Sequence, residues 1–334
     1  MAAAATTAAR KQSWRPLLWG LAAFLVVPSL PFFEALIPIR QTLLLLVPIL
    51  AVSSIVGWKL GGRAALAVIW IVLSVWMLLQ PAGPAGSQYD QMARGWAILL
   101  AASFGLVCLW STTTSFFPRA LAAVALAMAI GFIIALSAPS GIARFQHAAG
   151  EELSRRISGT IESLQAGMDT PEWKELAAKV PMLDTWNDES EAMMRNLPSR
   201  AASLLPALLA LESLAALALA WGLYRRLSPV KIGPALSPLI EFRFNDQLVW
   251  GLAVGATLCL LPAFAEGRNA GYNLLLFFGA LYLIRGTGVL AWMARGRYLL
   301  VFILSLIPQV FVIVTLALGL GDTWLDIRNR AKAT

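Results

Sequence analysis

Residues 281–292 read LYLIRGTGVLAW and place a single arginine, Arg285, inside an apolar run. A lone arginine in hydrocarbon costs between about 2.5 kcal/mol and well above 10 kcal/mol, so it needs a partner that offsets its charge. The apolar run extends from about residue 272 to residue 293, which is long enough to cross a bilayer. This stretch therefore predicts a membrane span that contains a compensated charge.

The composition of the whole chain is that of a membrane protein. Of its 334 residues, 59% are hydrophobic and only 13% are charged, whereas a soluble protein carries about 25% charged residues. One water-soluble core cannot bury so much apolar surface, so we expect the lipid bilayer to surround most of the chain. The net charge of +8 comes without a cluster of aromatic and basic residues, so we expect no nucleic-acid partner.

The hydropathy pattern predicts nine spans of about 20 residues each. They lie at residues 17–39, 41–58, 64–80, 95–111, 118–138, 201–224, 247–265, 272–293 and 298–320. The first continues past the length of a signal peptide without an evident cleavage site, and we interpret it as an uncleaved span. Pro28, Pro31 and Pro38 kink it or end it early. We expect an all-α polytopic bundle of eight or nine transmembrane helices, with a short amphipathic helical extracytoplasmic segment.

The distribution of basic residues predicts the orientation, because short cytoplasmic loops are enriched in lysine and arginine. We expect the chain in a bacterial cytoplasmic (inner) membrane, with its N-terminus in the cytoplasm. Twelve basic residues then face the cytoplasm: Arg10, Lys11, Arg15, Lys59, Arg63, Arg119, Arg225, Arg226, Lys231, Arg243, Arg295 and Arg297. The short outer loops hold only Arg40, Arg94 and Arg268. Nine spans would put three more cations of the C-terminal tail outside, so eight spans with a cytoplasmic C-terminus stay an alternative.

Residues 140–200 differ from the rest of the chain, with seven basic and ten acidic residues. They divide the chain into a five-span half at 1–139, an extracytoplasmic segment at 140–200 and a four-span half at 201–334. Apolar residues recur in this segment at helical spacing: Leu153, Ile157, Ile161, Leu164 and Met168. Thr170 is placed to cap a helix that starts at Pro171, and Asn187 or Asp188 to start another.

We therefore expect two or three short helices against the outer face of the bundle. One interpretation is a solvated connector that rests on lipid headgroups. The alternatives are a cap over a central cavity and a docking face for a periplasmic protein.

Glu212 lies in the middle of the 201–224 span and is also alone among apolar residues. Opposite charges at one depth offset each other's desolvation, so we predict a direct contact between Glu212 and Arg285. Asn273, Tyr282, Ser213 or Thr287 is placed to share it. Such a contact is a structural bridge that fixes the helix order or part of a ligand or ion site. The alternative is that Arg285 snorkels alone.

Sequence motifs for catalysis are missing, and we expect no enzyme and no cofactor. The chain has no GxxxxGK[ST] loop, no HExxH and no GxSxG. His147 is the only histidine, and the two cysteines, Cys108 and Cys259, fall in separate spans, so we expect no metal site. Tyr89–Asp90 and the GLGD that ends at Asp322 resemble the aspartate motifs of presenilin-type proteases. However, Asp90 is expected in a loop, Asp322 at the outer end of a span, and the PAL triplet precedes the GLGD, so we attribute the likeness to chance.

Two further features concern packing and anchoring. Pro229, Pro234 and Pro238 prevent a regular helix in residues 225–250, which we call the connector and expect at the cytoplasmic headgroups. It anchors the chain there or offers a coupling surface to a cytoplasmic protein. Gly279, Gly286 and Gly288, like the GLAVG of residues 251–255, permit close helix approach, within one chain or in a dimer.

Residues 195–293 resemble the YybS-like bacterial integral membrane proteins, a family with a domain of unknown function. The resemblance rests on RNLPSRAASLLPALL, on YRRLSPVKIGPALSPLIEFRFNDQLVW and on YNLLLFFGALYLIRGTGVLAW, in that order. The N-terminal half of that family is similar in hydropathy to the substrate-binding subunits of energy-coupling-factor transporters. This chain is longer than those subunits, has the insertion at 140–200 and lacks a clean AxxxA face in its first span.

The resemblance implies a role in small-molecule transport. We therefore expect a transport-related or solute-binding inner-membrane protein of unknown substrate, without its own ATPase, in which a small molecule and a membrane protein are the partners. The alternative is a non-catalytic membrane scaffold that recruits envelope or division partners through residues 140–200, with a periplasmic protein as its partner.

Overall fold

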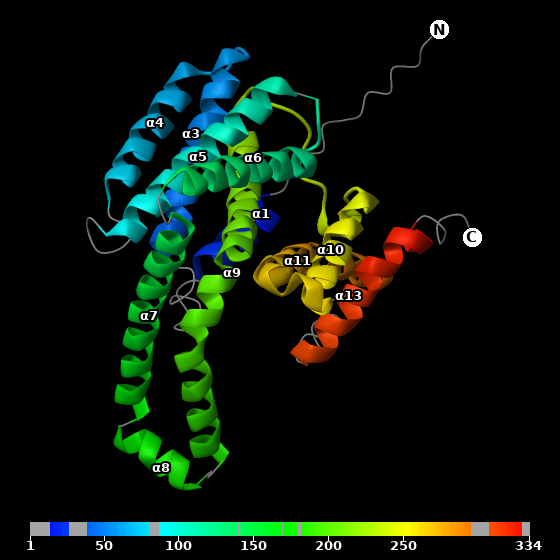
Figure 1. The fold of residues 1–334 in the computed structure, drawn as a ribbon. Helices are drawn as coiled ribbons and strands as arrows, with labels where there is room; N and C mark the ends of the chain where they lie inside the picture. Colours follow the sequence, from blue (N-terminus) through cyan, green and yellow to red (C-terminus); the bar gives the residue numbers. More distant parts are fainter. Residues whose placement is uncertain are drawn as a thin grey trace. The chain divides into compact units, whose positions relative to one another are not determined.

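The structure is a computed structural model that describes residues 14–26, 39–80, 87–111, 113–138, 141–168, 170–179, 182–294 and 307–328. The described part of the chain is helical and contains no strand. Its α-helices are α1 (Arg15–Val26), α3 (Ile39–Lys59), α4 (Ala64–Leu79), α5 (Gln88–Trp110), α6 (Phe116–Ser137), α7 (Gly141–Met168), α8 (Pro171–Lys179), α9 (Met182–Leu227), α10 (Val249–Leu260), α11 (Arg268–Met293) and α13 (Pro308–Leu325). The predicted all-α class is confirmed, and Figure 1 shows these helices.

Five helices in the described ranges are long and apolar enough to cross a membrane: Arg40–Lys59, Gln88–Trp110, Phe116–Ser137, Ala201–Leu227 and Pro262–Met293. Four apolar helices of 10–17 residues accompany them: Leu17–Val26, Ala64–Leu79, Asp246–Leu260 and Gln309–Leu325. Together they follow the nine predicted spans in order, but only five are long enough to cross a membrane, so the count of eight or nine spans stays a prediction. Residues 27–38 of the first predicted span and 298–306 of the last lie outside the described residues.

The chain forms two compact units. Unit 1 comprises residues 1–131 and 215–235, and unit 2 comprises residues 132–214 and 236–334. These units differ from the three sections expected from the sequence, because the single helix α9 contributes to both. The three sections stay a prediction.

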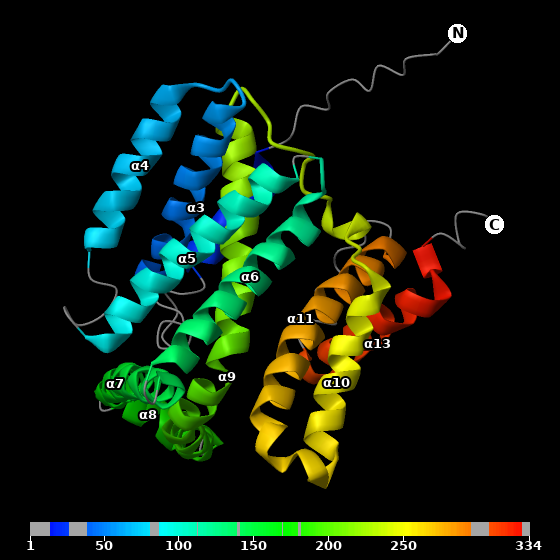
Figure 2. The same cartoon turned by 45° about the horizontal axis from the view of Figure 1, so that its top comes forward.

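Unit 1 is built around α3, which packs against α4 and α5 (Figure 2). Its core holds Ile49 of α3, Phe104 of α5 and Trp221 of α9, all with no exposed surface. Glycine brings two of these helices close, because a Cβ on Gly105 would lie 2.4 Å from Val52 Cγ1. The exposed surface of α4 is apolar, because most of the large apolar side chains of this helix are exposed. Such a helix suits lipid as its surroundings.

In unit 2, α10 and α11 form a hairpin, and α13 packs across α11 (Figure 2). The crossing depends on two glycines. A Cβ on Gly286 would lie 1.6 Å from the backbone oxygen of Thr315, and a Cβ on Gly319 would lie 2.1 Å from that of Tyr282. A Cβ on Gly288 would lie 2.3 Å from the backbone oxygen of Leu239 in the connector. The close approach predicted for Gly286 and Gly288 is confirmed within the chain, whereas a Cβ on Gly279 would meet nothing within 4 Å.

The described residues between 141 and 200 form three helical stretches, which confirms the expected number, but two of these helices are long. The helix α7 has 28 residues, and α9 runs without a break for 46 residues from Met182 into the apolar span. Figure 1 shows α7 and the first part of α9 running in opposite directions, with α8 between their ends. We call residues 141–200 the helical arm. The predicted start at Asn187 or Asp188 is wrong, because α9 begins at Met182.

Two local predictions for the helical arm are confirmed. The backbone N–H of Trp173 donates to Thr170 Oγ1 at 3.4 Å, and α8 begins at Pro171. On α7, Leu153 and Ile157 are each only 2% exposed, so the first part of the apolar stripe faces inward. Close packing at the base of the arm is visible at Gly150, where an added Cβ would lie 3.8 Å from Ala202 Cβ.

Candidate functional site

Arg285 is buried in α11, with 3% of its side chain exposed, and its polar contacts within the described residues go to two aspartates. Its Nε donates to Asp322 Oδ2 at 3.1 Å, and its Nη1 donates to Asp246 Oδ1 at 2.8 Å. Its Nη2 donates to the backbone oxygen of Asp322 at 3.2 Å. The guanidinium also lies over the ring of Phe244, with its carbon 5.2 Å from the ring centroid. The charge inside the apolar run is therefore compensated, as expected.

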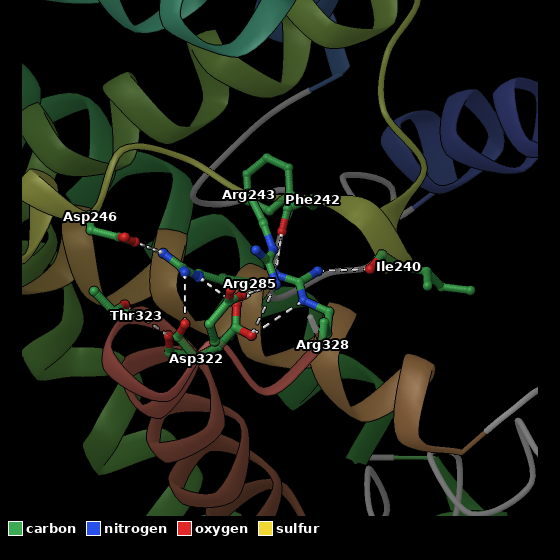
Figure 3. A network of polar contacts seen from close by, with 10 residues as sticks. Ile240, Phe242, Arg243, Asp246, Arg285, Asp322, Thr323 and Arg328 are labelled. Atoms are coloured by element: carbon green, nitrogen blue, oxygen red, sulfur yellow. Dashed lines mark hydrogen bonds and ion pairs between the residues drawn. The ribbon is translucent and has the colours of Figure 1, made fainter. Parts of the chain in front are cut away.

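Asp322 is the centre of a larger set of charges, shown in Figure 3. Its side chain is completely buried, and it also accepts a hydrogen bond from Arg328 Nη2 at 2.7 Å. A third arginine, Arg243, places its Nη2 3.7 Å from Asp322 Oδ1 and 2.7 Å from Asp326 Oδ1. We call this set the aspartate–arginine cluster: Arg243, Asp246, Arg285, Asp322, Asp326 and Arg328. It has three cations and three anions, so it is neutral as a whole.

The cluster joins three parts of unit 2, namely the connector, α11 and the end of α13. Arg328 lies just beyond α13 and donates from Nη1 to the backbone oxygen of Ile240 at 2.7 Å, and from Nη2 to that of Phe242 at 3.1 Å. In the connector, the Asn245 side chain accepts from the N–H of Gln247 and so starts the short helix that carries Asp246. The contacts of Arg328 fix the C-terminal end of α13 beside the connector.

The contact predicted between Glu212 and Arg285 is wrong, because the ion pairs of Arg285 among the described residues are with Asp246 and Asp322. Glu212 is itself buried in α9, with 6% of its surface exposed. The prediction considered only acids in the middle of a span. An arginine side chain is long enough to reach carboxylates at helix ends and in the connector, where burial costs less.

Tyr282 and Asn273, the other two predicted site residues, lie in different surroundings on α11. Tyr282 is fully buried and packs edge-on against Phe244, with 5.0 Å between ring centroids, so it belongs with Arg285. Asn273 instead contacts α9. Its Nδ2 donates to the backbone oxygen of Ser203 at 2.7 Å, and its Oδ1 accepts from the N–H of Ala207 at 2.9 Å. Whether any of the four predicted residues binds a ligand or ion stays a prediction.

The two aspartates of the protease-like motifs are both engaged by arginine. The sequence predicts Asp90 in a loop, but it lies in the first turn of α5, which Ser87 caps. It is 2% exposed and pairs with Arg94 at 2.6 Å. Asp322 pairs with Arg285 and Arg328 in the cluster. In the part of the chain that the structure describes, no group of three His, Cys, Asp or Glu side chains is arranged to hold a metal ion.

A smaller charge cluster lies on α7, outside the apolar helices. Glu152 is buried and accepts from Arg155 at 3.0 and 2.6 Å and from Arg156 at 2.8 Å. Burial by itself raises the pKa of the Glu152 carboxyl, but the hydrogen bond from Arg155 and the charge of Arg156 outweigh burial and hold the pKa below its ordinary value. The carboxylate is therefore charged at neutral pH.

Compared with models of protein families, with curated proteins and with solved structures, the chain has no match. The resemblance to the YybS-like family is not tested by these comparisons and stays a prediction. The chain is a helical protein with several helices that are long and apolar enough to cross a membrane.

Proposed function

We propose that the chain is a membrane scaffold of the bacterial cytoplasmic membrane, whose helical arm recruits an envelope or division protein. The observation that carries this proposal is the continuity of α9 over 46 residues, from Met182 to Leu227. Its apolar part begins at Ala201. At about 1.5 Å per residue, the preceding part extends the helix by roughly 28 Å. A partner bound to the arm would thus be held by the same helix that enters the membrane.

The surface of the arm supports contact with water and with a polar partner. On α7 the exposed side chains include Arg144, Glu151 and Glu162, whereas the apolar stripe of Leu153 and Ile157 is buried. A helix with this pattern lies at the surface of a folded unit and not in lipid. The arm therefore suits a protein partner that binds through charged side chains.

The aspartate–arginine cluster also supports a scaffold in preference to a transporter at this position. Its three cations and three anions are matched, and every polar contact of Arg285 is made within unit 2. A solute that used Arg285 would first have to displace Asp322 or Asp246. Buried charges that saturate one another hold helices in place.

The orientation that we propose places the N-terminus and the connector in the cytoplasm and the helical arm outside the cell membrane. Arg328 contacts the connector at Ile240 and Phe242, which supports a C-terminus on the same side as the connector. The three basic residues of the tail then also lie in the cytoplasm, which gives fifteen basic residues on the cytoplasmic side and three in the short outer loops. Of the two span counts, this arrangement favours the even one, eight.

A second candidate function, transport or solute binding with energy supplied by another chain, is favoured by one observation. Glu212 and Ser213 are buried in the apolar part of α9, at 6% and 0% exposure. Ionisable residues at this depth often mark a solute or ion pathway. The resemblance to the YybS-like family also supports transport.

Native mass spectrometry of the protein purified in lipid separates the two functions. A scaffold retains a protein at fixed stoichiometry, and reversing two exposed charges of the arm, Glu151→Lys with Glu162→Lys, releases it. The matched control Arg63→Gln, a charge change on unit 1, leaves the complex intact. A small molecule that co-purifies and is lost in Glu212→Gln would instead refute the scaffold and support transport.

A further inference from the structure

The end of unit 1 at which α9 stops carries an unbalanced positive charge. Six basic residues belong to three segments that meet there: Lys59, Arg63, Arg119, Arg225, Arg226 and Lys231. No acidic residue occurs in residues 57–63, 111–119 or 222–235, which form this end. We call these six residues the basic rim. It contrasts with the aspartate–arginine cluster of unit 2, in which each cation has a carboxylate partner.

Tyr224 holds the segments of the basic rim together. Its hydroxyl donates to the backbone oxygen of Val230 at 2.6 Å, which folds the start of the connector back onto α9. A Cβ on Gly57 would lie 2.2 Å from the same hydroxyl, so the end of α3 abuts α9 here. The neighbours of these residues in sequence, Lys59, Arg225 and Lys231, are thus brought to one place.

Arg119 shows how this end of the unit accommodates a buried cation without a carboxylate. It is 1% exposed and donates to the backbone oxygens of Ile232 at 2.8 Å, Ser111 at 2.7 Å and Thr114 at 2.9 Å. Its guanidinium carbon lies 4.9 Å from the ring centroid of Trp221. Carbonyl dipoles and a π-face solvate this charge but leave it uncancelled, so Arg119 adds a fixed positive field.

Within the described residues, Arg119 has one buried donor without an acceptor, its Nε, whereas Arg225 has two. Its Nε and Nη1 are buried, and within the described residues neither of them finds a hydrogen-bond acceptor. Buried donors of this kind are rare in native proteins and call for an acceptor. Nε and Nη1 belong to the two different edges of the guanidinium, so each edge of Arg225 holds one donor without an acceptor, and either edge matches two oxygens of a phosphate.

We propose that the basic rim is a binding site for the phosphate of an anionic lipid headgroup, with Arg225 as its bidentate ligand. The apolar residues that border the rim support lipid as the source of the phosphate. Trp58 is 51% exposed, Leu60 45%, Trp110 93% and Leu227 43%. Tryptophan and leucine exposed beside cations at the end of an apolar helix are typical of the headgroup level, where acyl chains lie on one side.

The experiment compares lipid binding by native mass spectrometry and by thermal unfolding of the full chain in detergent. Phosphatidylglycerol and phosphatidylcholine are titrated separately, and inorganic phosphate forms a third arm. We expect phosphatidylglycerol to bind at least tenfold more tightly than phosphatidylcholine, and inorganic phosphate to leave the unfolding temperature unchanged. Equal binding of the two lipids overturns the site, and inorganic phosphate that stabilises as much as phosphatidylglycerol overturns the assignment to lipid.

Variants assign the site to Arg225. Arg225→Gln should lose the tenfold preference for phosphatidylglycerol, whereas Arg40→Gln removes the same charge from an exposed position at the start of α3, outside the rim, and should keep it. Arg225→Lys retains the charge but lacks the bidentate edge. It replaces Arg225→Gln as the test if the glutamine variant does not fold. We expect it to lose about half of the preference, on a logarithmic scale. An unchanged preference in Arg225→Lys and Arg225→Gln would overturn the role of Arg225.

Discussion

Replacing Asp322 by asparagine removes the central negative charge of the aspartate–arginine cluster while keeping the shape of the side chain. The carboxylate is completely buried and accepts from Arg285 at 3.1 Å and from Arg328 at 2.7 Å. Those two arginine side chains are only 3% and 4% exposed, so they cannot turn to water when the charge is lost. Removing one partner of a buried ion pair costs about 3–5 kcal/mol, and we expect Asp322→Asn to lower the free energy of unfolding by this amount.

The matched control is Asp246→Asn, which removes a charge from the same arginine. The Asp246 side chain is 59% exposed, so water replaces much of its contact with Arg285. Exposed ion pairs contribute about 0–1 kcal/mol, and this variant should therefore stay within about 1 kcal/mol of the unaltered protein. Both variants are measured by reversible unfolding with SDS in mixed micelles, followed by circular dichroism.

A double-mutant cycle with Arg328→Met adds a second test of the same reasoning. If Asp322 stabilises the structure through Arg328, the two changes together cost less than the sum of the single changes. Strict additivity, or an Asp322→Asn variant as stable as Asp246→Asn, would refute the view that the cluster holds α13 to the connector and to α11.

Three further predictions concern other contacts. Gly286→Ala should lower the free energy of unfolding by about 1–3 kcal/mol, because the new Cβ would lie 1.6 Å from the backbone oxygen of Thr315. Gly279→Ala adds a Cβ with nothing within 4 Å and should change the free energy of unfolding by less than about 0.5 kcal/mol. Equal effects of the two variants in SDS unfolding would contradict this packing. Asn273→Leu should cost about 1–2 kcal/mol in the same assay by removing both contacts with α9, and no loss would mean that these contacts do not stabilise the packing of α11 against α9. Because the pKa of Glu152 is lowered in the folded protein, its stabilisation is complete above the ordinary pKa of 4.5 and is lost as the pH falls through the lowered value. Amide hydrogen exchange in α7 should accelerate below that pH relative to Glu152→Gln, and identical pH profiles would disprove the effect.

Apolar runs predict the fold well in this chain because lipid imposes a strong rule on sequence. A helix in hydrocarbon must be apolar over its whole length, so a helix such as α6 differs little from its predicted span at residues 118–138. The helical arm was predicted less well. Its apolar stripe and the Thr170 cap are local signals, but the continuity of α9 across Asn187 and Asp188 depends on packing that local signals do not contain.

The site could be predicted only in part, because charge pairing depends on tertiary distance. A lone arginine in an apolar run correctly predicts a compensating charge. Its identity could not be read from depth alone, since Asp246 precedes α10 and Asp322 lies near the end of α13. Gly286 and Gly319 bring α13 close enough to α11 for the contact with Asp322, and no local pattern pairs those two glycines. The available signal was Arg328, which lies six residues after the aspartate of the GLGD.

The side of the membrane on which each segment lies tests the account most directly. In a background with Cys108→Ala and Cys259→Ala, single cysteines replace the exposed Ser158 of α7, the exposed Gln247 of the connector and Ala333 of the tail. A membrane-impermeant maleimide is then added to intact and to permeabilised cells. We predict that the Ser158→Cys variant reacts in intact cells, whereas the Gln247→Cys and Ala333→Cys variants react only after permeabilisation. Labelling of the connector and the tail from opposite sides, or of the connector and α7 from the same side, would contradict the account.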